Sequence, residues 1–193
     1  MFLIRKPTAL AINHFRQAQG LLDFTYAAVG ATRDTPPPGF VVDRTREQIG
    51  VGETTFRRAQ EALRNWRQLE LGWVSLGTPP PAVKPGETVS VLARVYGLWS
   101  LNACRIVYVT QQQNPWPSFG YAYGTLPDHA ETGEERFLVE WTPRDDAVYY
   151  DILAFSRPHH FLSQAGYPIA RRLQRRFARD SMAAMRHAVA QAQ

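Results

Sequence analysis

The segment Glu87-Thr-Val-Ser-Val-Leu-Ala-Arg-Val-Tyr96 alternates between two sets of side chains with a period of two residues. One set is Val89, Val91, Ala93 and Val95, and the other is Ser90, Leu92 and Arg94. Because successive side chains of a β-strand point to opposite faces, this alternation predicts a strand with an apolar face. We therefore expect the hydrophobic core to form on a β-sheet.

The two-residue period extends on both sides of this segment. It predicts six strands, at 69–77, 87–96, 102–112, 118–126, 134–142 and 147–156, and residues 39–49 form a seventh candidate. The breaks between the six strands are short and contain proline or glycine. Short breaks favour antiparallel neighbours, because a parallel crossover needs a dozen or more residues.

Three segments follow the helical period instead. Residues 7–19 and 53–66 are amphipathic, and a longer tract at 159–190 is interrupted before Pro168. Pro168 suits the first turn of a restarted helix. The apolar stripe of this tract contains Ile169, Leu173, Phe177 and then Ala184 or Met185, and its basic stripe contains Arg172, Arg175, Arg176 and Arg179.

The order of these elements predicts an α+β fold with a curved seven-stranded antiparallel sheet wrapped on a long C-terminal helix. It resembles the helix-grip fold of the START-like superfamily, with the helix at 7–19 as an addition. We expect one domain over 1–193, with a helical extension at 1–38 and a helix-grip-like core at 39–190. The resemblance implies a ligand cavity between the concave sheet face and the last helix.

A second resemblance rests on four motifs. They are Phe24-Thr-Tyr-Ala-Ala-Val-Gly-Ala-Thr32, Gly50-Val-Gly-Glu-Thr-Thr-Phe56, Tyr123-Gly-Thr-Leu-Pro-Asp-His129 with Gly133-Glu-Glu135, and Phe155-Ser-Arg-Pro158. By these motifs the chain resembles, over about 21–190, a bacterial and plant family known as domain of unknown function 1990, or uncharacterised protein family 0548. This family carries no established activity.

Composition and charge exclude several classes of protein. Of the 193 residues, 45% are hydrophobic and 20% charged, which is typical of a folded globular protein. Cys104 is the only cysteine, so we expect no internal disulfide and no cysteine-based metal cluster. We assign no cofactor and no metal ligand from the sequence. Residues 157–193 carry +6 against a net charge of +5 for the whole chain, so the first 156 residues are slightly acidic. Because the sequence also lacks a helix-turn-helix pattern, we expect no nucleic-acid partner. Without a signal-like or membrane-spanning segment, the expected location is the cytoplasm.

Tyr121 and Tyr123 share one face of the strand predicted at 118–126, and glycine and alanine occupy the other face. On a cavity wall, two hydroxyl groups could orient a ligand. Alternatively, the tyrosines belong to an aromatic core and the small residues allow close packing of a helix. Trp66, at the end of the apolar face of 53–66, is a further candidate ligand contact.

Arg105 alternates with Val107 and Val109, which places it among apolar neighbours. An unpaired buried charge is strongly unfavourable, so Arg105 would need a carboxylate partner. The candidate partners are Glu135, Glu140 and Asp151. Such a pair would anchor the polar end of a ligand. The alternative is that Arg105 points outward and its apolar neighbours are exposed.

Residues 127–135 contain one imidazole and several carboxylates. The candidate functional residues among them are His129, Glu134 and Glu135. We interpret the segment as a polar hairpin that turns at Thr132-Gly133, with a polar pocket rim or a cation site as alternatives. The candidate ligand-binding residues are therefore Trp66, Arg105, Tyr121, Tyr123, His129, Glu135 and Asp151.

Three functions remain open from the sequence. The first is non-catalytic binding of a small apolar or amphipathic ligand in the cavity. The second is an enzyme of hydrolase or cyclase type that uses the same cavity, with His129 and Glu134 or Glu135 transferring protons. The third is peripheral association with anionic membranes or partners through the basic stripe Arg172, Arg175, Arg176 and Arg179.

Overall fold

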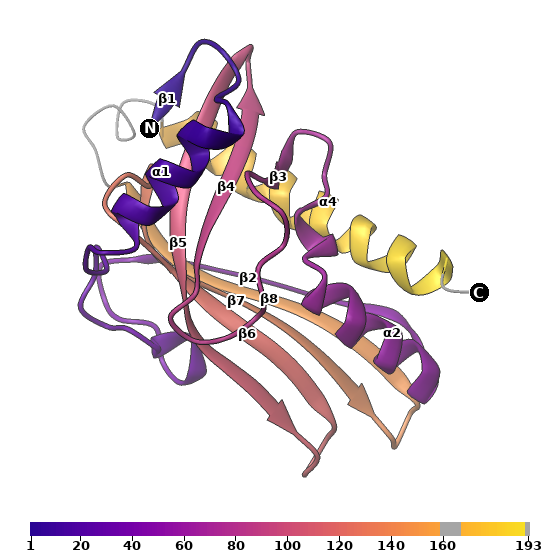
Figure 1. Ribbon diagram of the computed structural model, residues 1–193. Coiled ribbons are helices and arrows are strands. Elements are labelled where there is room, and N and C mark those ends of the chain that lie inside the picture. Colours follow the sequence, from indigo (N-terminus) through magenta and orange to yellow (C-terminus); the bar gives the residue numbers. More distant parts are fainter. Residues whose placement is uncertain (159–166, 192–193) are drawn as a thin grey trace.

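A curved antiparallel sheet forms the centre of the computed structural model, which describes residues 1–158 and 167–191 (Figure 1). The strand order is β2-β8-β7-β6-β5-β4-β3. The strands are β2 (Val41–Val51), β3 (Val74–Leu76), β4 (Thr88–Val95), β5 (Leu98–Gln112), β6 (Ser118–Thr125), β7 (Glu131–Thr142) and β8 (Ala147–Pro158). A two-residue strand, β1 (Phe2–Leu3), adds to β5. The predicted seven-stranded sheet is confirmed, with β1 as an addition.

Helices cover both faces of the sheet. On the concave face, α2 (Gly52–Arg64) and α4 (Tyr167–Gln191) contact each other, and α4 runs across the strands (Figure 1). On the other face, α1 (Ala9–Gln19) packs Ile12 against Leu92 and Leu101. The predicted α+β helix-grip arrangement, with its added N-terminal helix, is confirmed. Among the described helices, none combines the length and the apolar character needed to cross a bilayer.

The main hydrophobic core lies on the concave face, between the sheet and α2 with the C-terminal half of α4. The alternation of β4 explains its place, because Val89 points into this core while Leu92 points to the α1 side. The largest fully buried side chains are Trp66, Tyr121, Tyr150, Phe119, Phe137 and Phe155.

Two predicted boundaries are wrong. The strand expected at 69–77 is reduced to β3, because Trp66 adopts a left-handed conformation (φ 60°) and a 3-10 turn, η2 (Arg67–Leu69), follows it. The turn expected at Thr132-Gly133 lies inside β7 instead. There Gly133 has φ 152°, and a Cβ atom would lie 1.9 Å from the carbonyl oxygen of Phe155, so the glycine permits close strand pairing.

The long helix predicted at 159–190 is confirmed from Tyr167 onward, with Pro168 in its first turn. The first part of that prediction, 159–166, lies outside the described residues.

Candidate ligand pocket

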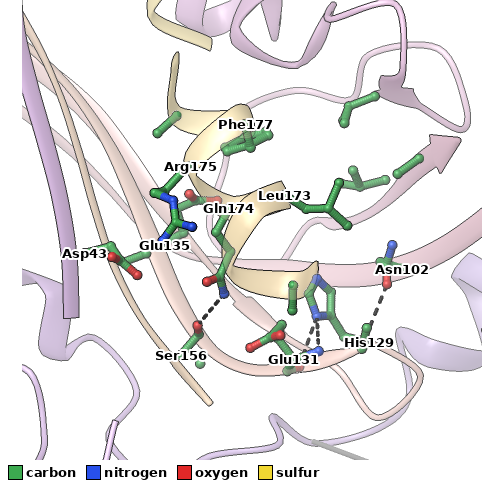
Figure 2. Close-up of a pocket in the computed structure, with 18 of the residues that line it drawn as sticks. Asp43, Asn102, His129, Glu131, Glu135, Ser156, Leu173, Gln174, Arg175 and Phe177 are labelled. Carbon is green, nitrogen blue, oxygen red and sulfur yellow. Dashed lines mark hydrogen bonds between the residues drawn. The ribbon is translucent and has the colours of Figure 1, made fainter. Parts of the chain in front are cut away.

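A pocket of about 870 Å³ lies between the concave face of the sheet and the N-terminal half of α4 (Figure 2). Its volume falls in the range of small-molecule sites, roughly 300–1,000 Å³. Most of its surface is apolar. The apolar lining residues include Val74, Val91, Ala93, Val95, Leu98, Tyr123, Ile152, Ala154, Ile169, Leu173 and Phe177.

The walls of the pocket come from two periodic patterns. In β4, the alternation places Val91, Ala93 and Val95 on the pocket side. In α4, Leu173 and Phe177 are one helical turn apart and face the sheet, where they remain only half-buried. The two apolar surfaces therefore face each other across an open space at this end of α4.

A half-buried carboxyl group forms one polar point of the pocket wall. Tyr123 donates its hydroxyl hydrogen to Glu135 Oε2 at 2.8 Å. Burial raises the pKa of Glu135 to about 7, the Tyr123 hydrogen bond opposes this, and the charge of Asp43 adds to the rise. Near neutral pH this carboxyl group is thus present both as a hydrogen-bond donor and as an anion.

A second group of polar side chains lies where β7 and β8 meet the start of α4 (Figure 2). Gln174 donates its amide hydrogen to Ser156 Oγ at 3.1 Å, and the main-chain N–H of Glu131 donates to His129 Nδ1 at 3.0 Å. Burial raises the pKa of Glu131. These side chains give this end of the pocket both donors and acceptors.

An ion pair closes the pocket between β2 and α4. Arg171 Nη2 lies 2.6 Å from Asp43 Oδ1. Asp43 is opposite Ala154 in the sheet register, so it points to the concave face. Together with the Gln174–Ser156 hydrogen bond, this pair holds the beginning of α4 at its distance from the sheet.

Three of the seven candidate residues line the pocket, namely Tyr123, His129 and Glu135. Trp66 and Tyr121 lie beside it in the core, with ring centroids 4.9 Å apart. The Trp66 indole N–H donates to the carbonyl oxygen of Pro81 at 2.9 Å, and the Gln68 amide donates to the Tyr121 hydroxyl. Their polar atoms are thus used within the protein.

Arg105 lies on the opposite, convex face. The register of β5 against β6 shifts between Ile106 and Tyr108, so Arg105 is opposite Gly124 whereas Val109 is opposite Tyr121. Strict alternation missed this bulge, and the prediction that Arg105 shares a face with Val109 is wrong. The expected carboxylate pairing is also wrong. Arg105 Nη2 donates to the carbonyl oxygens of Gly20 at 2.8 Å and Leu22 at 2.7 Å.

Asp151 is fully buried on the convex face as well. Its two oxygens accept from Arg44 Nη2 at 2.6 Å and from Arg136 Nη2 at 2.9 Å. Asp151 was a candidate partner of Arg105, and this pairing is wrong, because its arginine partners are Arg44 and Arg136. Because its side chain points away from the concave face, Asp151 ties β2, β7 and β8 together rather than facing the pocket.

Glu134 explains why two of the sequence motifs occur together. Its carboxylate accepts from the Tyr26 hydroxyl at 2.7 Å and from the main-chain N–H groups of Gly30 at 2.7 Å and Thr32 at 3.0 Å. The Thr32 hydroxyl donates a fourth hydrogen bond. The carboxylate of Glu134 is thus occupied in fastening the N-terminal segment to the convex face.

Several pocket residues were not predicted, namely Asp43, Glu131, Ser156 and Gln174. The sequence carried a usable signal for Asp43 and Gln174, since each is a polar residue at a position of its element that faces the inside of the protein. The contacts themselves join elements far apart in the sequence, which no local pattern indicates. The basic stripe of α4 is partly neutralised, because Arg176 and Arg179 both pair with Asp180.

Comparisons with known proteins place the chain in a family. The family described as "Domain of unknown function (DUF1990)" matches residues 25–184, and the chain belongs to it. A UPF0548 protein of Dictyostelium discoideum is 37% identical, covering 98% of this chain and 96% of its own length. A UPF0548 protein of Deinococcus radiodurans is 34% identical, covering 93% and 94%.

Solved structures with a similar course of the chain have low identity. The crystal structure of Ara h 8.0201 aligns with a TM-score of 0.48 at 10% identity, covering 78% of this chain and 98% of that one. Human STARD10 aligns with a TM-score of 0.44 at 10% identity, covering 92% and 81%. This similarity assigns no ligand.

Proposed function

We propose that the protein binds a small apolar or amphipathic ligand, without chemical conversion, in the pocket between the sheet and α4. The observation that carries the proposal is the space of about 870 Å³ between two apolar walls that face each other. Half-buried Leu173 and Phe177 lose water contact when an apolar molecule enters, and this burial is favourable.

The polar groups support an amphipathic ligand over a purely apolar one. Small-molecule sites typically combine apolar walls with a few placed polar groups that fix orientation. Here Glu135 with Tyr123 and the His129–Glu131 region supply two such points on the wall. A ligand with one polar end would direct it to one of these points and leave its apolar part against β4 and α4.

The test is a fluorescence titration with 8-anilinonaphthalene-1-sulfonate, an amphipathic probe whose emission rises in apolar sites. Ala178 lines the pocket and Ala183 is exposed on the same helix. We expect saturable binding to the wild type, a loss of about tenfold or more in affinity for Ala178→Trp, and an unchanged affinity for Ala183→Trp, because only the first indole occupies the pocket.

Thermal unfolding of each variant checks that the fold is retained. Ala154→Phe fills the same space from the sheet side, which separates filling of the pocket from a local effect on α4. Equal probe binding by the wild type, Ala178→Trp and Ala154→Phe would contradict the proposal.

Glu135 favours a second candidate function, an enzyme that uses the same pocket. A carboxyl group with a pKa of about 7 is suited to general acid–base catalysis near neutral pH. Glu134 cannot share this role, because its carboxylate is held on the other face of the sheet. Figure 2 shows His129 and Glu135 at separate sides of the pocket. A hydrolase or cyclase reaction would then depend on Glu135, with activity changing around pH 7.

A further inference from the structure

Four large apolar side chains surround the mouth of the pocket and remain exposed. They are Phe2 at 59%, Tyr96 at 76%, Leu98 at 47% and Ile169 at 47% relative exposure. We call these four residues the rim. Scattered single exposed residues are normal on protein surfaces, whereas a group around one opening indicates an interaction site.

The rim is assembled from β1, the turn between β4 and β5, and the start of α4, which lie at one end of the molecule (Figure 1). The turn contains an unusual choice of residue. Tyr96 has φ 50°, in the left-handed region where glycine or asparagine is favoured. Chain reversal alone does not account for a bulky aromatic side chain there, which suggests that its exposed ring has a use.

The chain segments that carry the rim contain positive charge and no acidic residue of their own. The segments that carry it, 1–22, 88–101 and 167–179, contain nine lysines and arginines and no aspartate or glutamate. Within the described part of the chain, five of these cations form no ion pair with a carboxylate: Arg5, Lys6, Arg94, Arg172 and Arg175. Lys6 and Arg94 both lie over the ring of Trp99, which follows Leu98 in the sequence and packs on the α1 side of the sheet.

We propose that the rim docks on the surface of an anionic lipid bilayer, with the mouth of the pocket facing the lipid. Aromatic and aliphatic tips that project from three separate segments can insert between lipid headgroups, while the surrounding cations contact anionic ones. The absence of acidic residues from these segments favours a uniformly negative surface over a protein surface of mixed charge. The idea that a ligand passes between the bilayer and the pocket rests on the proposed function. The docking itself rests on the rim alone.

The test is flotation of the purified chain with two kinds of vesicle, phosphatidylcholine alone and an equimolar mixture of phosphatidylcholine and phosphatidylglycerol. The rim variant is Tyr96→Asn with Leu98→Ser, since asparagine tolerates the left-handed conformation. The control is Trp116→Ser, which removes an aromatic side chain of 41% exposure from the turn at the other end of β5.

We expect the wild type and Trp116→Ser to float with the anionic vesicles, and much less with the neutral ones. We expect the rim variant to bind the anionic vesicles about fivefold or more weakly. Failure of the wild type to bind anionic vesicles, or binding by the rim variant equal to the wild type, would overturn the inference.

Titration of the wild type with the anilinonaphthalene probe, beside its flotation with vesicles, separates this inference from the proposed function, because Tyr96 and Leu98 themselves line the pocket. If the wild type binds the probe but not the anionic vesicles, ligand binding stands and the docking proposal fails. If the wild type binds the vesicles more strongly than the rim variant does but does not bind the probe, the docking proposal stands and the ligand-binding proposal fails. Light scattering gives a further outcome. If the wild type is a dimer, the rim variant is a monomer and neither binds vesicles, the rim contacts a second copy of the chain and the inference is overturned.

Discussion

Glu135 is a carboxyl group in a mostly apolar wall, and its position is unfavourable for stability. Burial raises its pKa from 4.5 to about 7, so the folded protein holds the proton more tightly than the unfolded chain does. A single hydroxyl, that of Tyr123, hydrogen-bonds to it at 2.8 Å. Perturbed carboxyl groups of this kind cluster at functional sites, and Glu135 stays a predicted ligand contact.

Glu135→Gln tests this environment through the pH dependence of stability. Between pH 4.5 and about 7 the folded state binds more protons than the unfolded state, so the free energy of unfolding of the wild type decreases as the pH rises through this window. The variant lacks this decrease. Relative to the wild type, the free energy of unfolding of the variant should rise by on the order of 3 kcal/mol from the acidic to the neutral end of this pH window.

Urea unfolding at several pH values measures the effect, with the exposed Glu61→Gln on α2 as the control. A constant difference between Glu135→Gln and the wild type across the window would show that the carboxyl group is not buried in the pocket wall.

Single residues were the least predictable level of the structure. For Arg105 the sequence predicted a carboxylate partner, whereas its acceptors are carbonyl oxygens of the segment after α1. One extra residue in β5 reversed the face of everything beyond Ile106. A bulge of this kind follows from pairing with the neighbouring strand, and the alternation within β5 does not reveal it.

At the level of elements, the bare face of β6 receives the N-terminal segment. A Cβ atom at Gly124 would lie 2.1 Å from the Tyr26 hydroxyl oxygen, which itself donates to Glu134. The close packing expected on this face therefore involves a loop rather than a helix. The family motif around Tyr26 and the motif around Glu134 thus meet across the sheet.

Gly124→Ala should displace Tyr26 and lower the free energy of unfolding by about 1–3 kcal/mol, because the added methyl group overpacks this contact. Chemical denaturation measures the loss, and limited proteolysis should show faster cleavage in the segment before β2. In the double variant with Tyr26→Phe, the clashing hydroxyl is gone. The loss of unfolding free energy in this double variant should therefore be smaller than the sum of the losses in the two single variants. Strictly additive losses would contradict the contact.

Elements with a long, regular period were predicted well, and short ones were not. The alternation at 87–96 gave β4, and the helical stripe through Leu173 and Phe177 gave α4, because each pattern spans several repeats. β3 has only three residues. Its neighbours Leu69 and Leu71 pack on the core without being strand, so their apolar character extended the predicted strand too far.

For the whole molecule, the pocket exists because the covering of the concave face is incomplete. The C-terminal half of α4 packs Met182 and Met185 directly into the core, whereas its N-terminal half stands off the sheet. Long-range contacts set this separation, among them Arg171 with Asp43 and Trp73 with Asp180. The sequence predicted a cavity only through the resemblance to helix-grip proteins, since its size depends on these distant pairs.

Native mass spectrometry of the freshly purified chain, followed by solvent extraction, tests the proposed pocket most directly. We expect an apolar or amphipathic molecule, one per chain, on the wild type and on Ala183→Trp but not on Ala178→Trp. A molecule retained equally by Ala178→Trp, or a bare wild-type chain that also fails to bind the anilinonaphthalene probe, would contradict ligand binding between the sheet and α4.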